Sequence, residues 1–470
     1  MAKATMTFPP DFKWGAATSS HQVEGHNRNN DWWVWEQQPG AILNGDRSGA
    51  ACEWWTRIEP DLDAAAEIGI NAHRISLEWS RIEPEPGRFD AGAIERYRDI
   101  LCAMIARSIE PMVTLWHFSN PLWLVEQGDF NNEAVVERFR RYAAEVVARL
   151  GDLVPIWITL NEPVVYIFMR YLDGSFPPAG QPGLSAARTA ALNLLRCHAA
   201  AYHEIKSRYP EALVSVAKSM QIFEAPPDGS ALDRWWAKRI GKIYNHAWLQ
   251  AMATGRAPWL AGRGRITHLS NSFDFIGINY YTRYLVRFPP PKGVIEQDWG
   301  SGVTVSDGGY GEVYPYGLYR VIRQALPYNK PIYITENGLP DRTDAMRPAF
   351  ILDHLRQVWH ALSFAYPVMG YYHWSLVDNF EWDRGWTQRF GLMALDTATQ
   401  ERTWRPSAHL YRDICHSYCI NNEMAARYAP EMLEVIFPGE GPGRAAAAQT
   451  LPAHGIYQDH LPEAGDPLQL

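Results

Sequence analysis

The sequence predicts an α/β fold, a (β/α)8 TIM barrel with enlarged loops at the C-terminal face of the strands. Three observations lead to this fold. Short apolar runs of strand type alternate eight times with longer stretches of helical period. The 470 residues are 47% hydrophobic, enough for a large core, and α/β barrels of this length form one domain. Glutamates follow two of the apolar runs, where barrel enzymes carry their chemistry.

The expected strands follow one another along the chain, with a helical stretch or a long loop between neighbours. They are Phe12–Ala17, Ala72–Trp79, Met112–His117, Trp157–Asn161, Leu213–Lys218, Phe273–Tyr280, Ile332–Thr335 and Val368–Trp374. Between them, segments such as Glu133–Leu150 and Ser185–Tyr209 carry apolar residues at helical spacing. A doubly wound open sheet is the alternative, and it predicts a glycine-rich phosphate turn after the first strand. The residues from Gly15 onward read Gly-Ala-Ala-Thr-Ser-Ser, which favours the barrel.

Two segments fall outside this alternation. The largest loop follows Tyr280 and runs through Pro289 to Gly311, and it is rich in proline, glycine and charge. We expect this loop to frame the entrance to the barrel. From Pro438 the composition shifts to proline, glycine and alanine with little periodicity. We therefore expect one barrel domain over residues 1–437 and a tail over residues 438–470 that is disordered or draped over the surface.

Charge and composition argue against several classes of function. The net charge is -8, the pI is about 6.0, and the basic residues are scattered among acids, so nothing favours binding to nucleic acid or an anionic membrane. Five cysteines without a CxxC pair argue against a disulfide framework and a thiolate zinc site. The first residues lack an apolar signal region, and no apolar run has the length of a membrane span. We expect a cytoplasmic protein.

Two glutamates stand directly after strand-type runs. Glu162 ends the run Ile-Trp-Ile-Thr-Leu-Asn-Glu, and Glu336 lies in Ile-Tyr-Ile-Thr-Glu-Asn-Gly. Two carboxyls in one pocket are the minimum for breaking a glycosidic bond, one protonated to assist the leaving group and one ionised to attack the anomeric carbon. The apolar neighbours Leu160, Pro163 and Val164 predict a desolvated Glu162, and a charged Glu336 raises the pKa of Glu162 further. Each motif alone also reads as a turn or a helix start; the pair, on the fourth and seventh expected strands, is specific.

From about Phe8 to about Tyr418 the chain resembles glycoside hydrolase family 1, the retaining β-glucosidases and β-galactosidases. The resemblance rests on the two glutamate motifs and on several segments that occur in the order of the family. It implies that Glu162 is the acid/base and that Glu336 is the nucleophile. It also implies that the activity needs only two carboxyls and water.

The resemblance further implies that three residues support the nucleophile. Arg74, in Ala-His-Arg-Ile-Ser, matches the arginine that holds it, and Tyr281 matches the tyrosine whose hydroxyl bonds to it. Asn279, two residues before Tyr281, belongs to the same motif. The alternative for Arg74 is a structural ion pair with Glu78 or Glu83, and the presence of the whole constellation favours the functional interpretation.

The resemblance also implies a sugar pocket built from separate segments. Gln22 would bridge the 3- and 4-hydroxyls, His117 would approach the 3-hydroxyl, and Asn161 would bond to the 2-hydroxyl. Bonds to the 2-hydroxyl tighten in the transition state, so Asn161 should affect turnover more than binding. Taken alone, a glutamine of this kind is usually at the surface, and a histidine is usually part of the core.

The segment from Trp374 to Trp382, Trp-Ser-Leu-Val-Asp-Asn-Phe-Glu-Trp, is the most specific stretch of the resemblance. Trp374 would stack under the sugar ring, although a lone tryptophan is more often core. Glu381 would accept from the 4- and 6-hydroxyls, and Trp382 would donate to the 3-hydroxyl. Relatives that act on 6-phosphorylated sugars replace the acid at Glu381, and a carboxylate repels a phosphate dianion. We therefore expect a non-phosphorylated glycoside.

One departure from the family pattern concerns the aglycone side. The family usually carries a tryptophan before Glu-Val-Tyr-Pro, and this chain has Gly311 there. We expect a wider aglycone site, or a wall from another residue such as Tyr310, and tolerance of bulky or apolar aglycones. His21, where tyrosine is common, and the Gly-Asp-Phe at Gly128 are smaller departures.

These observations predict a retaining exo-β-glycosidase that hydrolyses terminal non-reducing β-D-glucosyl residues through a covalent intermediate, with some activity on galactosyl or fucosyl residues. Its partner is a small-molecule β-glycoside. No cofactor is expected, and no metal, because the acids and histidines lack ligand spacing such as His-Glu-x-x-His. The alternatives are a 6-phospho-β-glycosidase, opposed by Glu381, and a catalytically silent sugar-binding barrel, opposed by the two retained glutamates. A homo-oligomer is compatible with the sequence.

Overall fold

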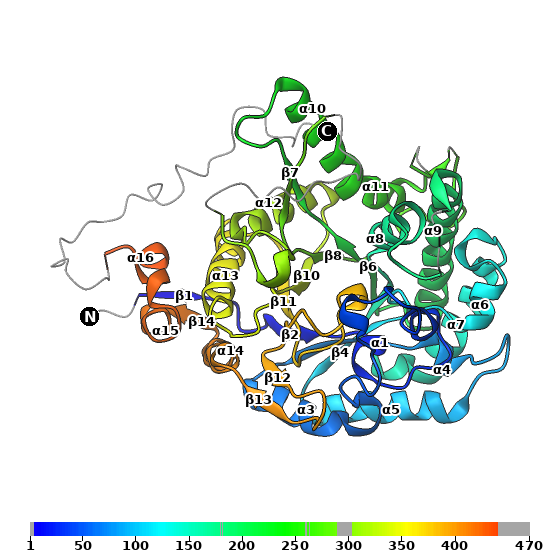
Figure 1. The fold of residues 1–470 in the computed structure, drawn as a ribbon, viewed down its shortest axis with the longest axis horizontal. Helices are drawn as coiled ribbons and strands as arrows, with labels where there is room; N and C mark the ends of the chain where they lie inside the picture. The colour runs from blue at the N-terminus through cyan, green and yellow to red at the C-terminus, as the bar shows by residue number, and fades with distance from the viewer. Residues whose placement is uncertain are drawn as a thin grey trace.

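The computed structural model describes residues 4–178, 180, 182–258, 261–262, 264–288 and 303–439. Its centre is a closed barrel of parallel strands, in the order β2–β3–β4–β5–β6–β8–β10–β11 and back to β2 (Figure 1). The strands are β2 (Lys13–Ala17), β3 (Ala72–Ser76), β4 (Glu110–Thr114), β5 (Ile156–Asn161), β6 (Leu213–Ser219), β8 (Ile276–Asn279), β10 (Ile332–Asn337) and β11 (Val368–Trp374). All eight predicted runs contribute a strand, so the prediction of a TIM barrel is confirmed.

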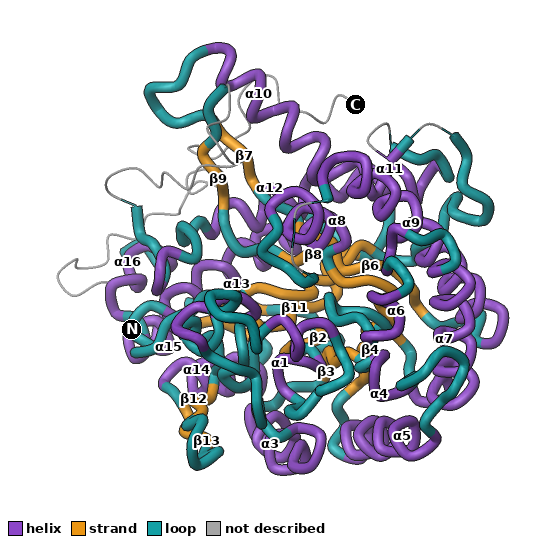
Figure 2. Tube along the Cα trace, turned by 45° about the vertical axis from the view of Figure 1, so that its right-hand side comes forward, coloured by secondary structure: helices purple, strands orange, loops and turns teal. Residues whose placement is uncertain are grey.

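Helices surround the barrel (Figure 2). The α-helices of the described residues are α1 (Ser20–Val23), α2 (Asp31–Trp35), α3 (Trp54–Ile68), α4 (Trp79–Ile82), α5 (Ala91–Ala106), α6 (Leu122–Glu126), α7 (Val135–Leu150), α8 (Pro163–Ile167), α9 (Gly183–Arg208), α10 (Ala231–Gly241), α11 (Ala247–Thr254), α12 (Pro315–Ala325), α13 (Arg347–Ser363), α14 (Pro406–Ser417), α15 (Asn422–Tyr428) and α16 (Leu433–Ile436). Helices α3, α5, α7 and α9 pack side by side, as do α12, α13 and α14, and α14 packs against α3. The predicted helices at 133–150 and 185–209 are α7 and α9.

The barrel strands are buried on both faces, because the barrel interior covers one face and the helices cover the other. Residues such as Ala72, Met112, Ile158 and Tyr372 fill the interior, and the alternate residues pack outward. Two predicted strands run three residues too far at the carboxyl end: Ala72–Trp79 against Ala72–Ser76, and Met112–His117 against Glu110–Thr114. The extra residues are buried beneath the loops of the barrel mouth, so their apolar character continues after the strand has ended.

Three small sheets lie outside the barrel in the part of the chain that the structure describes. Strand β7 (Ile222–Glu224) pairs with β9 (Arg283–Leu285), and β12 (Met393–Leu395) pairs with β13 (Arg402–Trp404). Strand β1 (Thr5–Thr7) pairs with β14 (Cys419–Asn421). Most of the predicted entrance loop, residues 289–302, and the predicted tail from residue 440 onward lie outside the described residues. In the described part, no helix is long and apolar enough to cross a membrane.

Candidate active site

Glu162 and Glu336 lie at the carboxyl ends of β5 and β10, in the mouth of the barrel. Glu162 has a left-handed backbone (φ 40°), caps the N-terminus of α8, and donates its amide to the carbonyl of Ala217 at 2.8 Å. This turn takes the chain out of the strand and leaves the carboxyl at the mouth. Glu336 stays in the extended backbone of β10. The fold places both glutamates beside the residues predicted to support them: Arg74 and Tyr281 contact Glu336, and Asn279 contacts Glu162.

Arg74, fully buried on β3, binds the carboxylate of Glu336 at 2.5 Å. Its other nitrogens donate to the hydroxyl of Thr114 at 3.0 Å and to the side-chain oxygen of Asn161 at 2.7 Å. The alternative pairing is not formed: Glu78 accepts bonds from serine hydroxyls, and Glu83 pairs with Arg141. The guanidinium of Arg74 therefore binds the candidate nucleophile and Asn161, and it is not part of a separate structural ion pair.

Tyr281 and Asn279 complete the surroundings of the two carboxyls. The hydroxyl of Tyr281 donates to Oε2 of Glu336 at 2.7 Å. The side-chain nitrogen of Asn279 donates to Oε1 of Glu162 at 3.0 Å, and its oxygen accepts from Thr335 at 2.7 Å. Asn279 is therefore fixed from one side and offers its amide to Glu162 from the other.

The two carboxyls have different electrostatic environments. Burial raises the pKa of Glu162 to about 8, and the charge of Glu336 adds to the shift. Burial also raises the pKa of Glu336, but Arg74 and the hydroxyl of Tyr281 oppose this rise by stabilising the carboxylate. Among the described residues, Glu162 accepts one side-chain hydrogen bond, from the amide of Asn279, whereas Glu336 accepts from a guanidinium and a hydroxyl. These surroundings favour the protonated form at Glu162 and the ionised form at Glu336.

The residues proposed for the sugar pocket lie on the same rim. The indoles of Trp374 and Trp382 both stack near His117, each with its ring centroid 6.0 Å from the centroid of the imidazole. Nε2 of His117 lies 2.9 Å from the side-chain nitrogen of Asn161, while its Nδ1 is buried without a protein partner in the described part. Because Asn161 already uses its oxygen on Arg74, it acts as the donor, which leaves the proton of His117 on Nδ1.

Gln22 and Glu381 form a second pair of polar groups. The amide nitrogen of Gln22 donates to Oε2 of Glu381 at 3.0 Å and to the carbonyl of Phe380 at 2.8 Å, while Ser19 donates to its oxygen at 2.6 Å. Burial raises the pKa of Glu381 to about 8, and the charge of Asp383 adds to this shift. A protonated Glu381 can both donate to and accept from a sugar hydroxyl.

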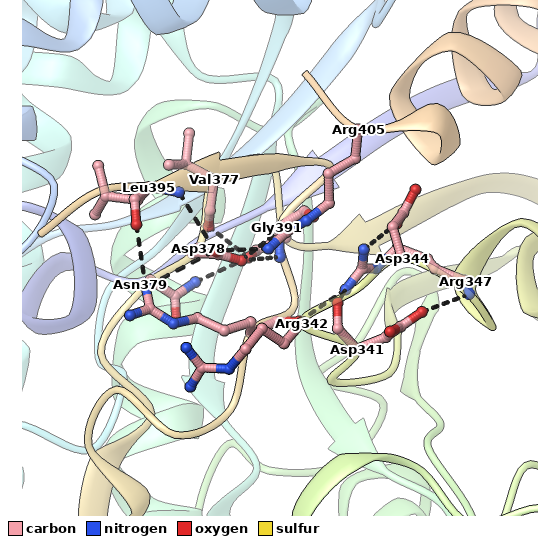
Figure 3. A network of polar contacts seen from close by, with 12 residues as sticks. Asp341, Arg342, Asp344, Arg347, Val377, Asp378, Asn379, Gly391, Leu395 and Arg405 are labelled. Atoms are coloured by element: carbon pink, nitrogen blue, oxygen red, sulfur yellow. Dashed lines mark hydrogen bonds and ion pairs between the residues drawn. The ribbon is translucent and has the colours of Figure 1, made fainter. Parts of the chain in front are cut away.

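A buried ion-pair network holds the segment that carries Glu381 (Figure 3). Asp378 accepts two bonds from Arg405, at 2.8 and 2.9 Å, and further bonds from the amides of Gly391 and Leu395 at 2.9 and 3.3 Å. Both oxygens of this carboxylate are therefore used. These four contacts fix the position of Asp378, and they thereby hold the segment that leads to Glu381 three residues later.

Gly311, where the family has a tryptophan, lies against Thr282. A Cβ atom at Gly311 would come within 2.9 Å of Cβ of Thr282, so this backbone has no room for a side chain. Tyr310 lies instead beside Tyr281 and Phe390, with ring centroids 5.9 and 5.1 Å apart. The charges of Glu381 and Glu162 contribute to the raised pKa of the Tyr310 hydroxyl, after burial. Tyr310 therefore lies close to both Glu381 and Glu162.

Sequence reasoning missed Lys218, which is buried on β6 beside the active site. The signal was present, because a lysine at the end of a strand covered on both faces has no obvious route to solvent. No group of three or more histidine, cysteine or acidic residues that could hold a metal occurs within the described ranges.

Comparisons with known proteins identify the family of the chain. The family profile described as Glycosyl hydrolase family 1 matches residues 4–419. Beta-glucosidase A of Thermotoga maritima is 30% identical, over 87% of this chain and 97% of that protein. A beta-galactosidase of Pyrococcus woesei is also 30% identical, over 91% of this chain and 99% of that protein.

Solved structures give the same result. The beta-glycosidase from Pyrococcus horikoshii is 37% identical and superposes with a TM-score of 0.81, over 90% of this chain and 98% of that one. The beta-glucosidase from Thermotoga maritima in complex with glucoimidazole is 29% identical with a TM-score of 0.82, over 88% and 99%. The profile match covers most of the chain, and the relatives are covered almost completely. The chain therefore belongs to glycosyl hydrolase family 1 and is a β-glycosidase.

Proposed function

We propose that the protein is a retaining exo-β-glycosidase that removes terminal non-reducing β-D-glucosyl residues, with some activity on galactosyl or fucosyl residues. The observation that carries the proposal is the unequal pair of carboxyls. Glu336 is bound by a guanidinium and a hydroxyl, and Glu162 has a pKa raised to about 8. An ionised group beside a protonated group is what a double-displacement mechanism needs at neutral pH.

In the first half of the reaction, Glu336 attacks the anomeric carbon while Glu162 gives its proton to the departing glycosidic oxygen. The product is an ester between the sugar and Glu336, and the aglycone leaves as an alcohol. In the second half, Glu162, now ionised, takes a proton from water, and the water oxygen displaces Glu336. An alcohol in place of water gives transglycosylation. Because the first half needs protonated Glu162, kcat/KM should fall as the pH rises through the pKa of Glu162.

The polar groups on the sugar side favour an unphosphorylated glycoside. Glu381 lies in contact with Gln22, and Asp383 is close enough for its charge to raise the pKa of Glu381. A phosphate dianion bound next to these two acids would be repelled by whichever of them is ionised. The 6-phospho-β-glycosidase alternative is therefore disfavoured by the surroundings of Glu381 as well as by its identity.

The aglycone side supports tolerance of bulky or apolar aglycones. The usual tryptophan platform is replaced by Gly311, which lies directly on Thr282. Tyr310 offers an aromatic wall nearby, in edge contact with Phe390. Comparing the hydrolysis of cellobiose with that of aryl, terpenoid or sterol glucosides tests this preference, and a marked preference for cellobiose would contradict it.

The first experiment is hydrolysis of p-nitrophenyl β-D-glucoside by the wild type and by Glu336→Ala, the variant with and without azide. We expect wild-type turnover, loss of turnover in the variant, and rescue by azide with α-glucosyl azide as product. Formation of the α-azide from a β-glucoside shows that azide attacks from the side on which the Glu336 carboxylate has been removed. This identifies Glu336 as the nucleophile, so the wild type, with two such displacements, retains the β-configuration. No wild-type turnover on the glucoside, the galactoside or their 6-phosphates would favour the silent sugar-binding barrel. The cytoplasmic location and the oligomeric state stay predictions, to be tested by fractionation and sedimentation.

A further inference from the structure

Lys218 is a buried basic residue near the acid/base that the mechanism above does not use. It is fully buried on β6. Its neighbour Ala217 packs inside the barrel, and successive side chains of a strand point to opposite faces, so Lys218 points outward, beneath the surrounding helices. A buried ammonium is costly unless other groups compensate its charge. The position therefore needs an explanation.

Few groups compensate this ammonium. Nζ of Lys218 donates to the carbonyl of Ser219 and lies 4.3 Å from the ring centroid of Tyr244. The hydroxyl of Tyr244 is itself bonded to the hydroxyl of Ser219 at 2.9 Å. Among the described residues, no carboxylate forms a salt bridge with Lys218, whereas Lys206 pairs with Asp274 at 3.2 Å. A structural ion pair thus does not account for Lys218.

The acidic group whose charge acts on Lys218 is Glu162. The two residues lie on adjacent strands at the same level, since Asn161 pairs with Ala217 and the amide of Glu162 donates to the carbonyl of Ala217 at 2.8 Å. Burial lowers the pKa of Lys218 to about 7, and the charge of Glu162 opposes this shift. In return, the charge of Lys218 lowers the pKa of Glu162.

None of the following titratable groups supplies an unpaired positive charge to Glu162 in place of Lys218. From the π-helical segment Lys242–His246, Tyr244 and His246 face Lys218, and burial, with the charges of Lys218 and Lys242, lowers the pKa of His246 to about 4. His246 is therefore neutral at the pH of interest. On the other side, Glu336 raises the pKa of Glu162 and Arg74 lowers it. Arg74 is already bound to Glu336.

We propose that Lys218 is a positioning residue that sets the ionisation of Glu162 in both halves of the reaction. The inference rests on the acid/base role proposed for Glu162. In the second half, Glu336 is an uncharged ester, and Glu162 must be a carboxylate to act as base. Lys218 then provides a cation that points away from the barrel interior, on the strand next to Glu162. It favours the basic form of Glu162 when that form is needed.

The test is the pH dependence of Lys218→Met, which removes the charge and keeps an unbranched apolar side chain. Loss of a nearby positive charge raises the pKa of Glu162 in both halves. With methyl β-glucoside, whose leaving group needs a proton, the basic limb of kcat/KM should move to higher pH. With 2,4-dinitrophenyl β-glucoside, whose leaving group needs none, kcat reports hydrolysis of the intermediate, and its acidic limb should also move to higher pH.

We expect shifts of about 0.5 to 1 pH unit, the size of an interaction between charges that are close but not in contact. The acidic limb should move more than the basic limb. Because the pKa of Lys218 is lowered to about 7, Lys218 is charged at the pH of the acidic limb and partly neutral at the pH of the basic limb. Lys206→Met is the matched control: it removes a lysine that is paired with Asp274, and both limbs should stay in place. Lys218→Gln serves if the methionine variant does not fold, since its amide can still donate to the carbonyl of Ser219.

Two results would overturn the proposal. One is a folded variant at position 218 whose limbs coincide with those of the wild type. The other is limbs that move in opposite directions, which indicates general loss of the active form instead of a change at one group. A wild type without turnover on any glycoside contradicts the proposed function, while unmoved limbs in an active enzyme contradict only the role of Lys218.

Discussion

The hydroxyl of Tyr281 offers a quantitative test of how Glu336 is kept ionised. It donates to Oε2 of Glu336 at 2.7 Å, while Arg74 binds the other oxygen. Burial, followed by the charge of Glu336, raises the pKa of the hydroxyl, so it remains a donor across the working pH range. The variant Tyr281→Phe removes this donor and keeps the ring.

The expected magnitude follows from the type of bond. A hydrogen bond to a charged group contributes about 1.5–3 kcal/mol, which corresponds to about 1–2 pKa units. Since the bond favours the carboxylate, its loss raises the pKa of Glu336, and the acidic limb of kcat/KM moves to higher pH by that amount. The assay is kcat/KM for p-nitrophenyl β-glucoside from pH 4 to 9, together with the product anomer.

Tyr372→Phe is the matched control. The hydroxyl of Tyr372 is buried inside the same barrel and has no hydrogen-bond partner in the part of the chain that the structure describes. Its removal should leave the acidic limb in place. The reasoning fails if Tyr281→Phe also keeps the wild-type limb, or if the two variants shift it equally.

Two further predictions concern stability. Asp378→Asn leaves Arg405 buried without its carboxylate, and we expect the free energy of unfolding, measured in urea, to fall by about 3–5 kcal/mol. The control Glu85→Gln breaks an exposed ion pair with Arg88 and should change this free energy little. An unchanged urea midpoint for Asp378→Asn would contradict the contacts in Figure 3. Gly311→Ala should lower the melting temperature, at a cost of about 1–3 kcal/mol, because the new Cβ meets Thr282 at 2.9 Å. An unaffected melting temperature would mean that the backbone there moves freely.

The barrel could be predicted from the sequence because parallel strands covered on both faces are continuous apolar runs. The ends of the strands could not. The run from Phe273 was predicted to span eight residues to Tyr280, whereas β8 covers Ile276–Asn279. Residues before and after β8 are buried by other parts of the fold, and burial alone does not separate a strand from a packed loop. The short pairs β7–β9 and β12–β13 depend on contacts between distant segments and had no local signal.

The motifs grouped the candidate site residues, but the contacts between these residues could not be predicted from the sequence. The pairing of Arg74 with Glu336 instead of Glu78 depends on the direction of the side chain from β3, which sequence spacing does not determine. The close approach of Gly311 to Thr282 likewise joins two loops that are distant in sequence. Lys218 ends the predicted strand Leu213–Lys218, and sequence spacing does not show that its ammonium is buried on the strand next to Glu162.

The pairing of β1 with β14 brings the two ends of the matched region together. Thr5 lies opposite Asn421 and Thr7 opposite Cys419, so the backbones there are about 5 Å apart. In a chain shortened to end after β14, without α15 and α16, a few added residues could join Asn421 to Thr5 while a new start is opened in an exposed turn elsewhere. Such a circular permutant should keep the carboxyl pair, because no barrel strand is cut. It would also let a binding module be fused at a chosen distance from the barrel mouth.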